Sequence, residues 1–104
     1  MKRGELWIAD LPRPDKPRPV VLVSREEAYS IREVITVAPV TTRVRDIASH
    51  VRVGRDDGLE REGAINCDRL ATIHRSQLKS RIARLRPDKL AELDDALHFA
   101  LGLA

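Results

Sequence analysis

The chain has 104 residues, of which 42% are hydrophobic and 34% are charged. This length and composition predict one soluble domain, spanning residues 1–104, built around a single modest core. The net charge of +3 mildly favours a polyanionic partner. Aromatic residues make up only 3% of the chain, which disfavours a protein that holds nucleic acid mainly by stacking bases on aromatic rings.

Several kinds of site and location are excluded by what the sequence lacks. No apolar run reaches the length of a membrane span or follows the basic N-terminus, so we expect a cytoplasmic protein without a membrane anchor or signal peptide. Cys67 is the lone cysteine, and we expect it to be buried and unpaired. His50, His74 and His98 lack ligand-like spacing, so we expect no metal and no cofactor, with His50 facing solvent on a strand.

The first half of the chain predicts short strands separated by polar connections. Residues 12–17 form a charged loop stiffened by three prolines, which we expect to cover a site opening near Arg18. The polar connection 25–30 predicts one helical turn capped by Ser24 together with Glu27. The strands expected in this half span residues 5–11, 19–24 and 33–41.

The second half predicts further strands and a closing helix. Residues 49–53 alternate between polar and apolar, and the polar segment 54–63 carries a turn signal at Asp57-Gly58. Two more strands are expected over residues 64–71 and 80–85. Pro87 then opens a helix. The apolar face expected for this helix consists of Leu90, Leu93, Leu97, Ala100 and Leu101.

Short strands followed by one helix predict a mainly β fold, a small closed or half-closed barrel with a C-terminal helix. Arg18 stands at the start of the apolar run 20–23, and Thr41 ends the strand that begins at residue 33. A guanidinium and a hydroxyl at neighbouring strand ends suit a phosphate group, because both donate hydrogen bonds and the guanidinium carries a fixed positive charge.

Four segments of the chain, in this order and at this spacing, resemble the MazF/PemK family of toxin endoribonucleases. They are residues 3–11 (Arg-Gly-Glu-Leu-Trp, then Asp-Leu), 18–24 (Arg-Pro-Val-Val-Leu-Val-Ser), 38–42 (Ala-Pro-Val-Thr-Thr) and 65–78 (Ile-Asn-Cys-Asp, then Thr-Ile and Leu). Each motif is weak alone, but the four together span nearly the whole chain. The resemblance implies an SH3-like barrel with helical insertions that forms a homodimer.

The resemblance also implies an activity: metal-independent cleavage of single-stranded RNA by the toxin of a type II toxin–antitoxin system. The 2′-hydroxyl of the RNA attacks the adjacent phosphorus, which leaves a 2′,3′-cyclic phosphate and a 5′-hydroxyl. The implied partners are single-stranded RNA, a second copy of the chain, and an antitoxin that lays an acidic, partly disordered segment over the RNA groove.

The same resemblance assigns Arg18 and Thr41 as the catalytic residues. Thr42 is the alternative to Thr41, and strand alternation sends the two to opposite faces, so that only one can face the site; we favour Thr41. The residues expected to contact RNA are Thr42, Arg43, Arg45, Asn66, Asp68 and Arg69. For Asp68 and Arg69 the alternative to an RNA contact is a solvated ion pair between the two side chains.

Some alternatives stay open on the sequence. The basic stripe over residues 75–89 could follow phosphates, bind an acidic antitoxin tail, or form a solvated strand face. The group that takes the proton from the 2′-hydroxyl could be Glu5, Asp10 or Asp15. The chain could also be a toxin of the same fold that binds a topoisomerase, or an RNA-binding module without activity.

Overall fold

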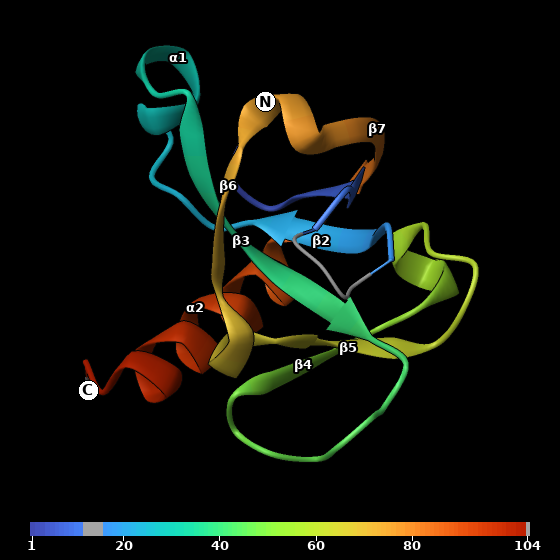
Figure 1. Cartoon of the computed structure of the whole chain (residues 1–104). Coiled ribbons are helices and arrows are strands. Elements are labelled where there is room, and N and C mark those ends of the chain that lie inside the picture. The colour runs from blue at the N-terminus through green and yellow to red at the C-terminus, as the bar shows by residue number, and fades with distance from the viewer. Residues whose placement is uncertain (12–15, 104) are drawn as a thin grey trace.

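The computed structural model of the chain describes residues 1–11 and 16–103. Within them the chain forms a seven-stranded antiparallel sheet, and a C-terminal helix packs against it (Figure 1). The strands are β1 (Glu5–Ala9), β2 (Arg18–Leu22), β3 (Val34–Thr41), β4 (His50–Val53), β5 (Gly63–Asn66), β6 (Ala71–His74) and β7 (Leu78–Arg84). The helices are α1 (Ala28–Ile31) and α2 (Pro87–Leu101), with 3-10 turns η1 (Arg55–Asp57), η2 (Cys67–Arg69) and η3 (Arg75–Gln77). The expected mainly β fold with a C-terminal helix is confirmed.

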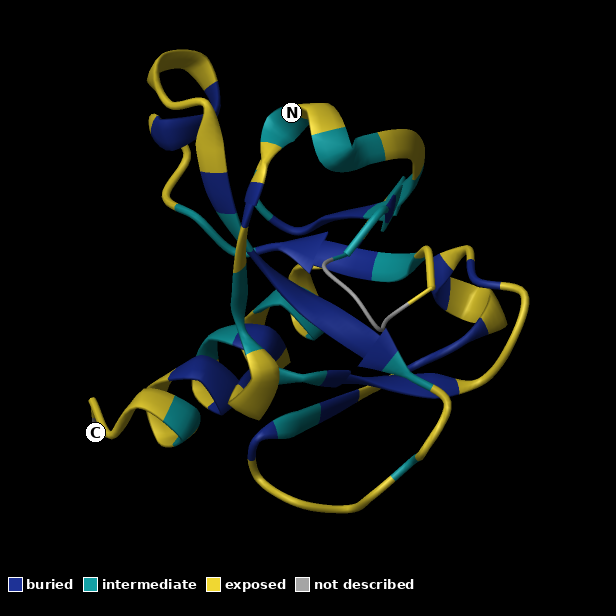
Figure 2. Cartoon of the chain, viewed as in Figure 1, coloured by how far each residue is buried: buried dark blue, intermediate teal, exposed yellow. Residues whose placement is uncertain are grey.

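Strand β3 organises the sheet, whose strand order is β4-β5-β3-β2-β1-β7. Its first half pairs with β6, from Val34 opposite His74 to Val37 opposite Ala71. Its last two residues pair with β5, while β2 runs along its other edge. Figure 2 shows most of β3 and the end of β2 as buried, and the β3–β4 loop as largely exposed.

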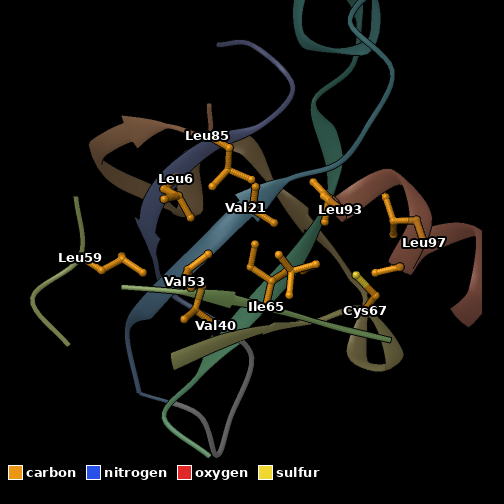
Figure 3. Packing of buried hydrophobic residues seen from close by; sticks show 13 residues of the cluster. Leu6, Val21, Val40, Val53, Leu59, Ile65, Cys67, Leu85, Leu93 and Leu97 are labelled. Atoms are coloured by element: carbon orange, nitrogen blue, oxygen red, sulfur yellow. The ribbon is translucent and has the colours of Figure 1, made fainter. Parts of the chain in front are cut away.

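Apolar residues cover both faces of the sheet because successive side chains of a strand point to opposite sides. On one face, Leu6, Val21 and Ile65 meet Leu93 and Leu97 of α2 in the larger core (Figure 3). On the other face, a smaller cluster gathers residues from β1, β2, β3 and β6 around Tyr29 of α1. Its buried members are Ala9, Val20, Leu22, Tyr29, Ile35, Val37 and Ile73.

The strand expected over residues 64–71 is wrong, because the chain turns in the middle of that segment. Asn66 ends β5, and its side-chain oxygen accepts a hydrogen bond of 2.9 Å from the Asp68 amide. Such a side-chain bond to the backbone two residues ahead bends the chain and competes with strand pairing. The turn η2 follows, and β6 then pairs with a different part of β3.

A short helical turn does form in the 25–30 connection, but the expected cap at Ser24 is wrong. The short helix α1 begins after Glu27, and no side chain caps it. The Ser24 hydroxyl oxygen instead accepts the Thr36 amide at 2.8 Å and continues the β2–β3 pairing beyond the end of β2. Residues 12–15 of the expected proline loop lie outside the described residues, as does the expectation that they cover a site.

The start of α2 at Pro87 is confirmed, and the apolar face is correct for four of its five residues. Leu93 and Leu97 are buried, Leu90 and Ala100 pack partly against the core, but Leu101 is 55% exposed. Leu101 is the last helical residue, since Gly102 adopts a left-handed conformation with φ of 68° and ends the helix. No helix in the described chain is both long and apolar enough to cross a membrane.

Cys67 is buried as expected, at 2% exposure. Burial, with a smaller effect of the nearby Asp68 carboxylate, raises the pKa of its thiol to about 11. Cys67 therefore stays protonated at neutral pH and packs as a small hydrophobic residue.

A buried carboxylate joins β1 to β7. The Glu5 side chain accepts hydrogen bonds of 3.1 Å from the Trp7 indole and the Lys2 amide, and of 3.0 Å from Arg81. Burial opposes ionisation of Glu5, but these donors outweigh it and lower the pKa of the carboxyl below its usual 4.5.

We expect Glu5→Gln to lower the free energy of unfolding at pH 7 by about 2 kcal/mol, because donors to a charged group lose their partner. A carboxyl whose pKa is lowered by folding stabilises the protein above its unfolded pKa and loses that effect as the pH falls through the folded pKa. The difference between wild type and variant should therefore shrink below pH 4.5 in urea denaturation series. Glu27→Gln, at an exposed residue, is the control. A constant difference down to pH 3 would contradict this account.

Candidate active site

The register of the β2–β3 ladder sets Arg18 across from Thr41. In the β2–β3 ladder Val21 pairs with Ala38 and Val20 with Pro39. Continuing the antiparallel register by two residues places Arg18, the first residue of β2, opposite Thr41, the last residue of β3. Directly opposed residues share one face of a sheet, so both side chains extend to the same side. Both residues are half-buried.

The Thr41 hydroxyl is oriented by its own backbone. Its oxygen accepts the Arg43 amide at 3.1 Å, where the chain leaves β3. Since that bond uses a lone pair, the hydroxyl hydrogen is left to be donated to a ligand.

A polar pocket of about 350 Å³ opens beside Thr41. It lies between the β3–β4 loop, the start of β4 and the η2 turn. Its lining residues are Thr41, Arg43, Arg45, Ile47, His50, Asn66, Asp68 and Arg69. The structure thus brings together six of the residues expected at the site, and Arg18 adjoins them through the strand register.

Thr42 faces a different cavity. This cavity, of about 490 Å³, has Ile8, Leu59 and Ile82 in its wall beside Thr42, and we call it the apolar hollow. Its lining also includes the charged residues Glu60, Arg61 and Glu62. Thr41 lines both cavities because it stands at the strand end, where the two meet. Both threonines therefore line the apolar hollow, and Thr41 also lines the polar pocket, whereas Thr42 does not.

The η2 turn is fixed to the start of β4 by a buried serine. Ser49, 2% exposed, donates its hydroxyl to Asp68 Oδ2 at 2.5 Å, and its carbonyl accepts the Cys67 amide at 2.9 Å. Asp68 therefore bonds to Ser49, and the structure shows no ion pair between Asp68 and Arg69 within the described residues. The anchored turn holds one carboxylate in a pocket that otherwise contains three arginines.

The basic stripe over residues 75–89 is mostly engaged in the fold. Lys79 pairs with Asp10 at 3.2 Å, Arg81 with Glu5 at 3.0 Å, and Arg75 donates to the Arg32 carbonyl. These contacts favour the structural interpretation of the stripe over a phosphate track.

The acids considered as proton acceptors are engaged as well. Glu5 is held by Trp7 and Arg81, and Asp10 by Lys79. Asp15 lies outside the described residues. In the ranges 1–11 and 16–103, no group of three or more His, Cys, Asp or Glu side chains is arranged to hold a metal ion.

Sequence reasoning missed His50 and Ser49. His50 was expected to face solvent, but it is half-buried and lines the polar pocket. The alternation of residues 49–53 puts His50 on the same side as Arg52, but nothing local to that strand marks His50 as a pocket residue. The pairing of His50 with Asn66 beside the η2 turn could not be predicted, because residues 64–71 were expected to form one continuous strand.

An arginine-rich polar pocket at the edge of a small antiparallel sheet is typical of proteins that bind an anionic nucleic-acid strand. Comparison with known proteins narrows the class. The family model described as PemK-like, MazF-like toxin of type II toxin–antitoxin system matches residues 2–101. The chain belongs to this toxin family.

Individual relatives agree with that assignment. Endoribonuclease MazF3 of Mycobacterium tuberculosis is 38% identical over 90 residues, covering 86% of this chain and 84% of that protein. The structure of Mycobacterium tuberculosis toxin MazF-mt6 is similar with a TM-score of 0.88 and 34% identity, over 96% of this chain and 98% of that one. A mycobacterial endoribonuclease solved in complex with its cognate antitoxin gives a TM-score of 0.90 at 26% identity, over 100% and 97% of the two chains.

We expect Gly63→Ala to displace Thr41, because a Cβ at Gly63 would stand 2.6 Å from the Thr41 carbonyl oxygen. A backbone atom cannot move aside cheaply, so unfolding free energy should fall by about 1–3 kcal/mol in urea titrations. The matched control is Gly54→Ala, where the added methyl meets only the flexible Glu62 carboxylate. Equal stability of the two variants would show that β5 and β3 adjust to the methyl.

Proposed function

We propose that this chain is a metal-independent endoribonuclease that cleaves single-stranded RNA as the toxin of a type II toxin–antitoxin pair. The observation that supports the proposal is the β2–β3 register: continued by two residues, it sets Arg18 across from Thr41, which lines the arginine-rich polar pocket. Membership of the toxin family and the similarity to MazF3 support it.

In this proposal the RNA supplies its own nucleophile. The 2′-oxygen forms a bond to phosphorus and loses its proton, while the bond from phosphorus to the 5′-oxygen breaks and that oxygen gains a proton. The products are a 2′,3′-cyclic phosphate and a 5′-hydroxyl. The protein has to hold the backbone in line for this displacement and stabilise the charge that develops on the phosphoryl oxygens.

Arg18 and Thr41 fill these two roles. The Arg18 guanidinium clamps and neutralises the phosphoryl oxygens, because its planar fork of donors matches their geometry. Thr41 donates its hydroxyl hydrogen to one of them, with the Arg43 amide fixing the hydroxyl from behind. Arg43 and Arg45 contact the neighbouring phosphates from the exposed β3–β4 loop, and Asn66, Asp68 and Arg69 contact the bases. Thr42 adds an RNA contact at the boundary with the apolar hollow.

We expect Arg18→Ala and Thr41→Ala each to lower the cleavage rate about 10²–10³-fold, the usual cost of one oriented donor to a developing oxyanion. The assay incubates a long mixed-sequence RNA with protein in EDTA and identifies 5′-hydroxyl ends. Arg84→Ala, which removes an exposed arginine of β7, is the matched control.

Two outcomes would contradict the proposal. Full cleavage by folded Arg18→Ala would remove Arg18 from the site. Intact RNA with the wild type would leave the binding alternatives, and RNA binding without cleavage would then separate an inactive RNA-binding module from a toxin that binds a topoisomerase.

The proposal includes a homodimer and an antitoxin. The apolar hollow suits a second copy of the chain, because it adjoins Thr41 and would bring two sites to one interface. The antitoxin would lay an acidic segment over the arginines of the polar pocket and so compete with RNA, in the cytoplasm where both are present.

We expect Ile8→Glu to convert the dimer into a monomer. Ile8 lines the hollow and belongs to neither core cluster, so a charge there disfavours association without removing core packing. Analytical ultracentrifugation at micromolar protein should give twice the chain mass of 11.7 kDa for the wild type and the chain mass for the variant. Ile31→Glu, at an exposed position of α1, should remain dimeric. A dimeric Ile8→Glu would place the interface elsewhere.

A further inference from the structure

His50 differs from the other histidines of the chain in how its ring is held. His74 Nδ1 accepts the Ser76 amide and contacts the Ser76 hydroxyl at 2.8 Å, and His98 Nδ1 contacts the Asp94 carbonyl at 2.8 Å. Neither His74 nor His98 lines the polar pocket. The His50 ring lines that pocket, and its Nδ1 is buried without a hydrogen-bond partner among the described residues.

The burial of one ring nitrogen determines what the other can do. A buried N–H without an acceptor is rarer and more costly than a buried lone pair, so the geometry assigns the ring hydrogen to Nε2. Nε2 is not among the buried polar atoms that lack a partner, and no described residue accepts a hydrogen bond from it. His50, which lines the pocket, thus carries a donor on the ring nitrogen that is not buried.

Sheet geometry gives the separation between His50 and Thr41, the residue proposed to hold the reacting phosphate. His50 pairs with Asn66, Thr41 pairs with Ala64, and β5 lies between β3 and β4. Two strand spacings and two residues separate Thr41 from His50, which gives roughly 12 Å between their Cα atoms. His50 and Thr41 are therefore too far apart to hold the same phosphoryl oxygens, and His50 meets a neighbouring part of the strand.

The chemistry around His50 suits a nucleobase better than a second phosphate. Asp68 brings a carboxylate into the same pocket, where it repels phosphate and accepts hydrogen bonds only. Asn66, directly across from His50, uses its side-chain oxygen on the Asp68 amide and keeps its NH₂ group for a ligand. Donors and an acceptor side by side match the edge of a base, which presents both.

We infer that His50 donates a hydrogen bond from Nε2 to an acceptor on a nucleobase next to the scissile phosphodiester, and so helps determine the sequence at which the RNA is cut. This inference rests on the proposed ribonuclease function. His50 is a specificity-determining residue in this scheme and takes no part in bond breaking.

The test uses two replacements that separate the ring nitrogens. A Gln side chain places its amide nitrogen near the position of Nε2, whereas Asn places a polar atom near Nδ1. Cleavage sites of wild type, His50→Ala, His50→Gln and His50→Asn are mapped on a randomised RNA pool. Rates are then measured on the preferred sequence and on sequences changed at one base. His98→Ala serves as the control, since that residue lies on α2 outside the polar pocket.

We expect His50→Ala to cut with a relaxed preference at one position flanking the cleaved bond. Its kcat/KM on the preferred sequence should fall about 10-fold, the usual worth of one hydrogen bond, and should change little on sequences with another base there. His50→Gln should restore most of the preference and His50→Asn should not. An unchanged motif and rate in His50→Ala, or an equal loss on every sequence, would overturn the inference. Rescue by Asn instead of Gln would overturn the assignment to Nε2.

A second measurement separates this inference from the proposed function. Imidazole ¹⁵N spectra of the wild type are recorded with and without a single-stranded RNA whose 2′-hydroxyls are methylated and which therefore cannot be cleaved. We expect the His50 signals, identified by their loss in His50→Gln, to show an Nε2–H ring and to shift on RNA addition, while those of His98 stay in place. If the wild type fails to cleave RNA but His50 shifts, the proposed nuclease fails and the base contact stands. Absence of a His50 shift at RNA concentrations that saturate binding overturns the contact.

Discussion

The fold depends on the double use of strand β3, which pairs along one edge with two segments that follow one another in the sequence. Its first half takes β6 and its end takes β5, so the chain has to leave the sheet between them. The Asn66 side chain makes that exit by capturing the Asp68 amide, and Ser49 then anchors the turn. The same turn that lets β3 be shared also delivers Asn66, Asp68 and Arg69 to the polar pocket.

This dependence explains which parts of the structure the sequence alone could and could not predict. Apolar periodicity located the strands of the first half within about two residues and α2 at its first residue, because burial of one face fixes those patterns locally. The interruption at residues 66–69 was missed because Ile65, Cys67 and Leu70 are apolar in a way that suits a continuous strand. The competing side-chain hydrogen bond of Asn66 becomes visible only with the backbone in place.

The residues of the candidate site also fall into those that the sequence could suggest and those that it could not. Arg18 and Thr41 could be proposed from the sequence through motifs at the ends of two apolar runs, and the β2–β3 register, continued to those strand ends, gives them a common face. His50 was not accessible, since its place in the pocket depends on β4 pairing with β5 and on the turn beyond it. A residue whose role depends on non-local pairing carries no local signal, even when its own strand is correctly located.

The distribution of charge shows how a modest net charge of +3 can serve a polyanion. Two basic side chains of β7 form ion pairs within the fold: Arg81 with Glu5 of β1, and Lys79 with Asp10, the residue after β1. At the polar pocket Arg43, Arg45 and Arg69 have no ion pair with a described residue, and the carboxylate that lines the pocket, Asp68, accepts a hydrogen bond from Ser49. Because these two basic residues of β7 are paired with acids and, within the described part of the chain, the arginines of the polar pocket are not, the positive potential is concentrated at the pocket edge of the sheet. The Asp68 carboxylate adds a hydrogen-bond acceptor to this pocket without cancelling the positive potential of the three arginines. Such a surface can attract any RNA strand and still distinguish among bases.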